Sequence, residues 1–249
     1  MKPAIFKIFY KAFLYTAAFF FASSTSAQVF IETYPAGKGK NPPVLVYGRS
    51  TLPNEIPYDK VKGSAFWNSD WQLASLYGNN AKEKWFCKSK LNLVTGEVYF
   101  LNKNGEEKVA DKGLIKMIVY FKNNDTSTMD AVFAYTGNYP DLQVKQKSDT
   151  YLQILNSGKH ELLKLYKRSV ASADSLFGTL KRYYFATEIN YFIHSNQKTE
   201  AIKKLNKETV LHYIPNSSSG NDWINQNKID LRKEKDVIEF LNYYNANNL

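Results

Sequence analysis

The sequence contains a single cysteine, and this scarcity limits both the chemistry and the stabilisation that the chain can use. One thiol cannot form an intramolecular disulfide bond, and it cannot supply a zinc site built on several cysteines. Cys87 follows Trp85 and Phe86, and this apolar setting predicts a buried, unreactive thiol. We therefore expect the fold to be stabilised by its hydrophobic core.

Histidine is nearly as scarce, and the three histidines lack the spacing of a metal site. The segment that starts at His160 begins like the helical zinc motif H-E-x-x-H, but Lys164 stands where the second histidine ligand is required. His194 and His212 have no metal-like spacing to each other or to His160. We expect no metal and no cofactor, and we assign residues 160–164 to a strand on the surface of a sheet.

The N-terminal segment is predicted to be a signal peptide, residues 1–27. Its apolar run, residues 12–22, spans only about half of the ~30 Å hydrocarbon layer, which is too short for a membrane helix. Three lysines precede the run: Lys2, Lys7 and Lys11. Thr25 and Ala27 occupy the −3 and −1 positions of a cleavage site before Gln28. We therefore expect a protein that is periplasmic or secreted, and not an integral membrane protein.

The chain has a moderate excess of positive charge, with 33 Lys and Arg against 23 Asp and Glu. The formal net charge is +10, and removal of residues 1–27 with their three lysines leaves +7. Opposite charges are mixed in residues 103–112 and 229–239, which is typical of a solvated surface. We therefore expect no nucleic-acid partner, whereas anionic lipid headgroups and acidic glycans stay open as partners.

Residues 30–195 have the pattern of a β-rich fold, because their apolar residues occur in short runs bounded by Gly, Asn, Asp and Pro. Tight turns are predicted at Gly96, Gly105 and Gly158. Strands are expected, among others, at residues 97–101, 114–121, 129–135, 150–155, 160–167, 182–186 and 190–194. The predicted fold class is α+β and mainly β: a curved antiparallel meander sheet or a sandwich, with a β-rich domain over residues 28–195.

The periodicity becomes helical near the end of the chain, and residues 196–249 are expected to be a helical segment packed on the same body. The first helix would follow Thr199, a residue that can cap a helix, and would bury Ala201, Ile202 and Leu205. Residues 215–220 are rich in Ser and are expected to be a flexible loop.

A second helix is expected from about Lys233 to Tyr244. Its apolar face consists of Val237, Ile238, Leu241 and Tyr244. Neither helix has an apolar stripe wide enough to be stable alone, so we expect both helices to pack against the sheet.

No pattern in the sequence predicts a catalytic centre. The serines lack the G-x-S-x-G pattern of a nucleophile elbow. Four dispersed carboxylates offer the only material for an acid/base pair: Glu55, Asp59, Asp70 and Glu97. Carboxylates scattered in this way occur in every soluble protein, so no catalytic residue is assigned.

Aromatic residues are abundant, with 18 Tyr, 16 Phe and 4 Trp, and most of them are expected to fill the interior of the sheet. Three rings in the later strands would bind a sugar or an apolar ligand if they were exposed: Tyr183, Phe185 and Tyr191. They are the candidate ligand-binding residues, and the identity of the ligand stays open.

Three stretches of the chain share a pattern with other proteins: residues 61–74, residues 90–101, and the run from Lys228 to the Tyr-Tyr-Asn at 243–245. Together they resemble a family of uncharacterised exported proteins of Gram-negative bacteria. In that family a small β-rich body ends in a Lys-rich helix that closes on Tyr-Asn. The resemblance implies export and a single body, and it implies no functional site.

Three functions are compatible with these observations. The first is a non-enzymatic binding or envelope-associated module whose partner is an envelope glycan, a lipid or a protein. The second is a periplasmic carrier of an apolar or glycan ligand, and the third is a carboxylate-dependent hydrolase. A cavity lined by Tyr183, Phe185 and Tyr191 would favour the carrier, and two carboxyl groups about 5–10 Å apart would favour the hydrolase. A filled core without either feature would favour the module.

Overall fold

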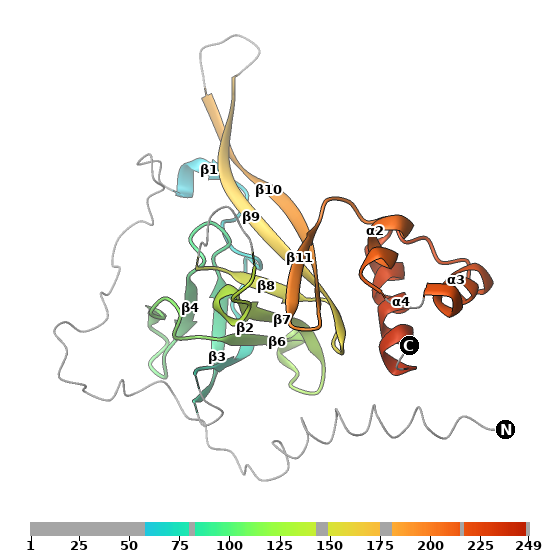
Figure 1. Cartoon of the computed structure of the whole chain (residues 1–249). Helices are drawn as coiled ribbons and strands as arrows, with labels where there is room; N and C mark the ends of the chain where they lie inside the picture. The colour runs from blue at the N-terminus through green and yellow to red at the C-terminus, as the bar shows by residue number, and fades with distance from the viewer. Residues whose placement is uncertain (1–57, 80–82, 143–148, 175–180, 215–216, 248–249) are drawn as a thin grey trace.

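The computed structural model describes residues 58–247 apart from 80–82, 143–148, 175–180 and 215–216 (Figure 1). The described part consists of one large sheet of 11 strands, open and curled, followed by three helices. The prediction of a mainly β fold with a curved antiparallel sheet and C-terminal helices is confirmed. The predicted signal peptide lies outside the described residues.

The sheet combines two antiparallel meanders, which meet where β2 pairs with β6. The first meander runs from β2 to β5 and the second from β6 to β11, while β1 adds to β10 in parallel. The strands of the first meander, preceded by β1, are β1 (Val61–Lys62), β2 (Gln72–Tyr77), β3 (Lys84–Leu91), β4 (Val98–Leu101) and β5 (Glu107–Val109). Those of the second are β6 (Met117–Phe121), β7 (Met129–Tyr135), β8 (Tyr151–Ile154), β9 (His160–Asp174), β10 (Lys181–Ser195) and β11 (Lys198–Ile202).

Glycine makes the turns at the three predicted positions. Gly96, Gly105 and Gly158 all have positive φ, between 71° and 138°. Only glycine adopts such a backbone readily. A Cβ atom at Gly96 would also overlap the backbone oxygen of Asp149, so this turn excludes a side chain on steric grounds as well.

β9 and β10 form a long hairpin that projects from the rest of the sheet (Figure 1). The two strands pair over 15 residues each, from His160 opposite Ser195 to the far end. The predicted strands 160–167, 182–186 and 190–194 were too short, because the hairpin extends beyond the region that the core covers. No Gly or Pro interrupts either strand, so backbone pairing continues where burial stops.

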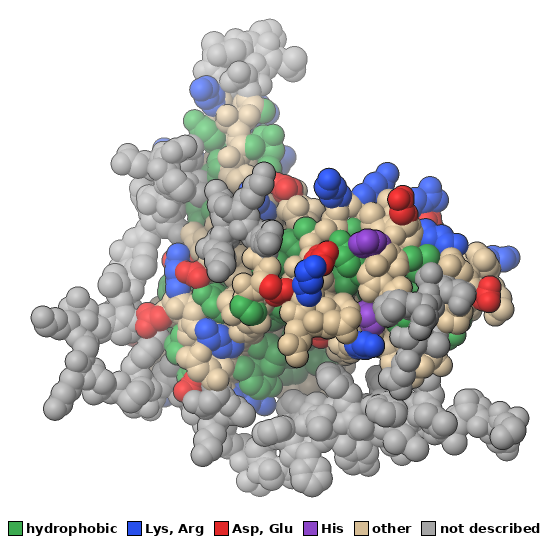
Figure 2. Space-filling model, in the orientation of Figure 1, with side chains coloured by type: hydrophobic (Ala, Val, Ile, Leu, Met, Phe, Trp, Pro, Cys, Tyr) green, Lys and Arg blue, Asp and Glu red, His purple; other side chains and the backbone are tan. Residues whose placement is uncertain are grey.

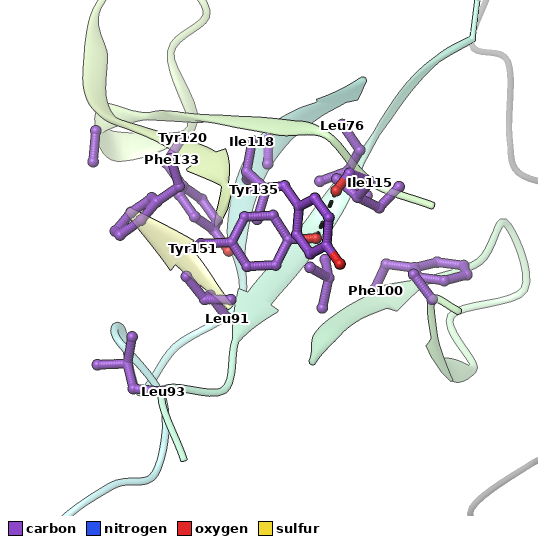
Figure 3. Close-up of a cluster of buried hydrophobic side chains, with 14 residues drawn as sticks. Leu76, Leu91, Leu93, Phe100, Ile115, Ile118, Tyr120, Phe133, Tyr135 and Tyr151 are labelled. Carbon is purple, nitrogen blue, oxygen red and sulfur yellow. Dashed lines mark hydrogen bonds between the residues drawn. The ribbon is translucent and has the colours of Figure 1, made fainter. Parts of the chain in front are cut away.

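The interior of the curl is filled by aromatic and aliphatic side chains from β2 to β8 and their connections (Figure 3). Tyr120 and Phe133 are fully buried, and Trp67 lies 5.1 Å from both rings, stacked on the first and edge-on to the second. Ser89 donates a hydrogen bond of 3.1 Å to the Tyr120 hydroxyl, so this buried oxygen has a partner. In this part of the sheet the aromatic side chains form the core, as the sequence predicted.

Trp67 belongs to a segment that connects two distant parts of the sheet, which we call the strap (residues 61–67). At one end the strap forms β1 beside β10, and at the other it pairs with the backbone of the β3–β4 connection. Arg168 of β9 holds its middle, because its Nη1 donates to the carbonyl oxygens of Ser64 and Phe66 at 2.6 and 2.7 Å. The strap therefore joins the long hairpin to the first meander.

The first predicted helix is wrong, because the residues after Thr199 belong to β11. Asn196 and Gln197 both have positive φ and make a two-residue turn, which returns the chain antiparallel to β10 over five residue pairs. Sheet pairing thus outweighs the helical spacing of the apolar residues. α2 (Lys207–His212) begins later, where Asn206 Oδ1 accepts a hydrogen bond of 2.8 Å from the Thr209 amide.

The Ser-rich segment predicted to be a loop is also corrected, because α3 (Ser217–Gln226) begins within it. The packing of its side chains on α4 explains why this segment is helical, although its serines and glycine have low helix propensity. Trp223 stacks on Tyr243 of α4, with ring centroids 4.4 Å apart, and Ile224 is buried. Gly220 is also buried against Phe240, where a Cβ atom would be tightly packed.

α4 (Glu234–Ala246) agrees with the predicted helix and packs on the long hairpin (Figure 1). Its predicted residues Val237, Leu241 and Tyr244 are buried, together with Phe240, whereas Ile238 is only half-buried. The same packing corrects the assignment of residues 160–164 to a surface strand: the strand exists, but His160 and Lys164 are buried because α4 covers this face.

The C-terminal end of α4 is fixed on β9 through one amide side chain. Asn245 Oδ1 accepts from the backbone amide of His160, and Asn245 Nδ2 donates to the His160 carbonyl, both at 2.9 Å. The side chain therefore pairs with the edge of β9 as a neighbouring strand would. The Tyr244 ring lies edge-on to the His160 ring, 5.3 Å away, so the Tyr-Asn at the end of the helix makes the contact.

Among the helices of the described residues, none has the length and apolar character needed to span a bilayer.

Candidate functional site

A groove lies where β11 leaves β10 and the chain enters the helices. It has a volume of about 410 Å³, within the range of small-ligand sites. Its apolar lining comes from both strands and from the residues that follow them: Ile189, Tyr191, Ile202 and Leu205. Three cationic side chains complete the lining: Lys203, Lys204 and Arg232. Figure 2 shows Lys and Arg side chains gathered along the upper edge of this part of the molecule.

Local structure explains why the cations lie at the groove. β11 ends at Ile202, and Asn206 caps α2 only four residues later, so Lys203 and Lys204 occupy the short connection between the two elements. Ile202 and Leu205 on either side are buried. The two lysines between them are exposed and make no ion pair with any residue that the structure describes.

Arg232 differs from the two lysines because its charge is partly compensated. Its Nε and Nη2 donate to the two carboxylate oxygens of Asp230 at 2.8 and 3.0 Å. These hydrogen bonds from the Arg232 side chain lower the pKa of Asp230 to about 2. The positive charge available to a ligand therefore comes mainly from Lys203 and Lys204.

Behind the groove a polar cluster joins the hairpin to the start of α4. The Tyr191 hydroxyl donates to Glu234 Oε2 at 2.7 Å, and Lys164 Nζ lies 2.7 Å from the same oxygen. Burial lowers the pKa of Lys164, but the hydrogen bonds to Glu234 and Tyr166 outweigh it and the net shift is upward. Burial and the Glu234 hydrogen bond raise the pKa of Tyr191 to about 12. At neutral pH the cluster therefore contains a charged lysine and a neutral phenol.

The three aromatic candidates are not brought together. Tyr191 lines the groove, but its hydroxyl points to Glu234 and is already bonded. Tyr183 and Phe185 lie on the projecting part of β10, six or more residues away, which is about 20 Å along a strand. Phe185 packs edge-on against Tyr58 at 5.5 Å and lies beside the strap, so its ring is used in packing.

The residues considered for hydrolysis are also dispersed. Asp59 lies in η1 (Tyr58–Lys60), Asp70 precedes β2, and Glu55 is outside the described residues. Glu97 Oε2 accepts hydrogen bonds from Thr95 and Tyr99, which fixes it in the turn before β4. Asp59, Asp70 and Glu97 do not line the groove.

One serine does contact a histidine, which the sequence pattern did not indicate. Ser195 Oγ lies 2.9 Å from His160 Nδ1, the distance of a nucleophile and its base. A catalytic pair also needs a group that orients the base, and His160 Nε2 has no hydrogen-bond partner among the described residues. Burial lowers the pKa of His160, as does the charge of Lys159. The pair is therefore best explained as packing beneath α4.

Two other kinds of site, a reactive thiol and a metal site, were considered. Burial raises the pKa of the Cys87 thiol to about 12, so the thiol is neutral and unreactive at physiological pH. Within the described ranges, no three His, Cys, Asp or Glu side chains lie together in a way that could hold a metal ion.

The sequence interpretation missed the cationic side of the groove. Lys203, Lys204 and Arg232 stand in runs of mixed charge that resemble an ordinary solvated surface. The relevant stretch is Ile-Lys-Lys-Leu at 202–205, which we interpreted as part of a helix because Ala201, Ile202 and Leu205 have helical spacing. Recognising the two-residue turn at Asn196 and Gln197 would have placed these lysines at the end of a strand.

Comparison with known proteins found no match: no protein-family model, no curated protein and no solved structure is similar to the chain. The resemblance to exported proteins of Gram-negative bacteria therefore stays a prediction, and the function has to be argued from the groove itself.

Proposed function

We propose that the protein is an exported, non-enzymatic binding module that binds an anionic ligand with an apolar part in the groove between β10, β11 and the helices. One observation carries the proposal: Lys203 and Lys204 are exposed beside an apolar lining, and they form no ion pair with the residues that the structure describes. A carboxylate, sulfate or phosphate group would interact with the lysines while its apolar part covered Ile189 and Leu205.

The filled interior supports a binding module over a carrier. A carrier that holds its ligand inside the curved sheet needs open space there, whereas Trp67, Tyr120 and Phe133 pack together in that position. The filled interior therefore supports a ligand site on the outside of the sheet, at its junction with the helices.

Export is part of the proposal and is supported by residues 1–27. The basic start, the short apolar run and the small residues before Gln28 agree with each other as a cleaved signal. N-terminal sequencing of the native protein should begin at or near Gln28. A cytoplasmic product that still starts at Met1 would contradict the assignment.

Ligand binding is tested with anilinonaphthalene sulfonate, an amphiphilic anion whose fluorescence rises in an apolar site. We expect saturable binding that weakens at high salt, because the lysines are exposed and screened by ions. The double variant Lys203→Glu/Lys204→Glu should weaken binding by about tenfold or more.

A matched control keeps the change in net charge the same. Lys112→Glu/Lys122→Glu reverses two exposed lysines that do not line the groove, one in the turn before β6 and one in η2 (Lys122–Asn124), and should bind the probe like the wild type. Equal losses in both double variants would show that only net charge matters. Mass spectrometry of molecules that co-purify with the native protein then identifies the natural ligand.

A further inference from the structure

The outer edge of β10 is only partly covered by other strands. β1 covers it at Tyr183 and Tyr184, and β11 covers it from Tyr191 to Ser195. Between them no described strand pairs with this edge over residues 186–190. Ile189 in this gap is 45% exposed, so the strand is accessible to solvent at this position.

The turn after β10 shows which backbone groups point out of the gap. In a two-residue hairpin the flanking residues, Ser195 and Lys198, form a hydrogen-bonded pair. Bonding direction alternates along a strand, so Thr187 and Ile189 also direct their N–H and C=O groups to this outer edge. Glu188 and Asn190 direct theirs to β9 instead. The gap therefore presents a row of backbone donors and acceptors that no strand of the described residues pairs with.

The gap and the groove are continuous. Ile189 belongs to both, and Tyr191 and Ile202 extend the apolar lining to the point where β11 ends. Lys203 and Lys204 lie directly beyond that point. A ligand here thus meets backbone hydrogen-bonding groups, an apolar lining and uncompensated positive charge together.

We propose that the natural ligand is an extended acidic segment of a partner protein, which adds to the edge of β10 as a strand between β1 and β11. This inference rests on the proposed function and names the class of its ligand. Backbone hydrogen bonds to Thr187 and Ile189 hold the segment, and acidic side chains interact with Lys203, Lys204 and Arg232. The gap accommodates a segment of about five or six residues at ~3.3 Å per residue.

The positive charge beside the gap favours an acidic segment as the ligand over a second copy of the chain. Pairing of two β10 edges around a twofold axis would place the exposed lysines Lys203 and Lys204 of both copies at one interface. Like charges in an interface oppose association, whereas an acidic strand neutralises them.

The first experiment uses fluorescein-labelled peptides of alternating Glu and Val in a fluorescence anisotropy titration. The peptide of Glu and Val should bind, and a matched peptide of Lys and Val should bind at least about tenfold more weakly. Alternate amides of a strand face opposite edges, so two peptides are compared: one N-methylated at the odd positions and one at the even positions. One of these peptides should lose binding, because its methyl groups face β10, and the other should still bind. Equal binding of the two peptides would overturn strand addition.

The second experiment changes the edge itself. Ile189→Pro removes the outward N–H, a change that edge strands tolerate, and should abolish peptide binding. Ile189→Ala keeps the N–H and should bind the peptide more tightly than the proline variant does. Equal affinities of the two variants would overturn the proposal.

A third experiment uses the unmodified protein, so its result does not depend on whether the proline variant folds. Amide hydrogen exchange followed by NMR should slow at Thr187 and Ile189 when the Glu-Val peptide is added, and should be unchanged at Glu188 and Asn190. No added protection would overturn the proposal.

The outcomes separate this proposal from the proposed function. If the peptide fails to bind while the binding of anilinonaphthalene sulfonate is still weakened by the lysine substitutions, strand addition is wrong but the proposed anion site is retained. Dimerisation of the free protein through β10 would instead identify a second copy as the occupant.

Discussion

The two sides of the molecule are stabilised by different kinds of contact. Inside the curl of the sheet, large rings such as Tyr120 and Phe133 pack on one another, and their few polar atoms are bonded within the core. On the other side, α4 also buries an apolar face, but polar groups hold both of its ends on β9. Apolar packing supplies most of the stabilisation in both regions, while the polar contacts determine where along β9 the helix lies.

The largest expected effect is in the sheet interior. Phe133→Ala should lower the free energy of unfolding by about 3–5 kcal/mol, because Phe133 is fully buried against Trp67 and Tyr120 and leaves a cavity. A urea titration followed by tryptophan fluorescence measures the loss. Met129→Ala on the same strand is the control, and it should cost less than about 0.5 kcal/mol because Met129 is 60% exposed.

The apolar face of α4 should give a nearly comparable loss. Leu241→Ala is expected to cost about 2–5 kcal/mol, because Leu241 is fully buried between the helices and the hairpin. Lys235→Ala, on the exposed face of the same helix, should change stability by less than about 0.5 kcal/mol. Equal, negligible effects in a denaturant titration would mean that α4 contributes nothing to the stability of the sheet.

The polar contact at the start of α4 should contribute less. Lys164→Met removes the partner of Glu234 and is expected to cost about 1–2 kcal/mol, below the range for fully buried pairs because the Glu234 side chain is 33% exposed. A double-mutant cycle with Glu234→Gln should show a coupling of about 1 kcal/mol. Strict additivity of the two changes would indicate that the ion pair does not position the helix.

The smallest expected effect is a dependence of stability on pH. Burial lowers the folded-state pKa of His160 below its ordinary value of 6.5, so the unfolded chain binds more protons as the pH falls below 6.5. The contribution of His160 to stability should therefore be fully present at pH 8 and should be lost between pH 6.5 and its lower folded pKa. His160→Asn should show a flatter profile in urea titrations between pH 8 and pH 5; parallel profiles would refute the assignment.

The sequence predicted the fold well where local signals and packing agree. Gly96, Gly105 and Gly158 marked turns that require positive φ, and the alternation in 129–135 gave β7 with its correct bounds. The face of α4 was also correct at Val237, Leu241 and Tyr244. In each case a short stretch of chain contains the whole signal.

The errors occur where a distant partner decides the local structure. The spacing of Ala201, Ile202 and Leu205 is helical, but residues 198–202 form a strand because β10 pairs with them. Gly220 lies in a helix because Phe240 packs against it. The candidate groove was missed for the same reason, since Ile189 and Arg232 meet only in the folded chain. Of the predicted ligand-binding residues, Tyr191 lies in the groove, whereas Tyr183 and Phe185 do not.

The strap has a consequence for the order in which the chain folds. Val61 pairs with Tyr183, and Ser64 is held by Arg168, so these contacts close loops of more than one hundred residues. During synthesis the strap emerges before β9 and β10 exist, whereas hairpins such as β3–β4 need only their own residues. The strap is therefore made early but is among the last segments to reach its native position. Until then Trp67 is absent from the interior, and the aromatic core of the sheet stays incomplete.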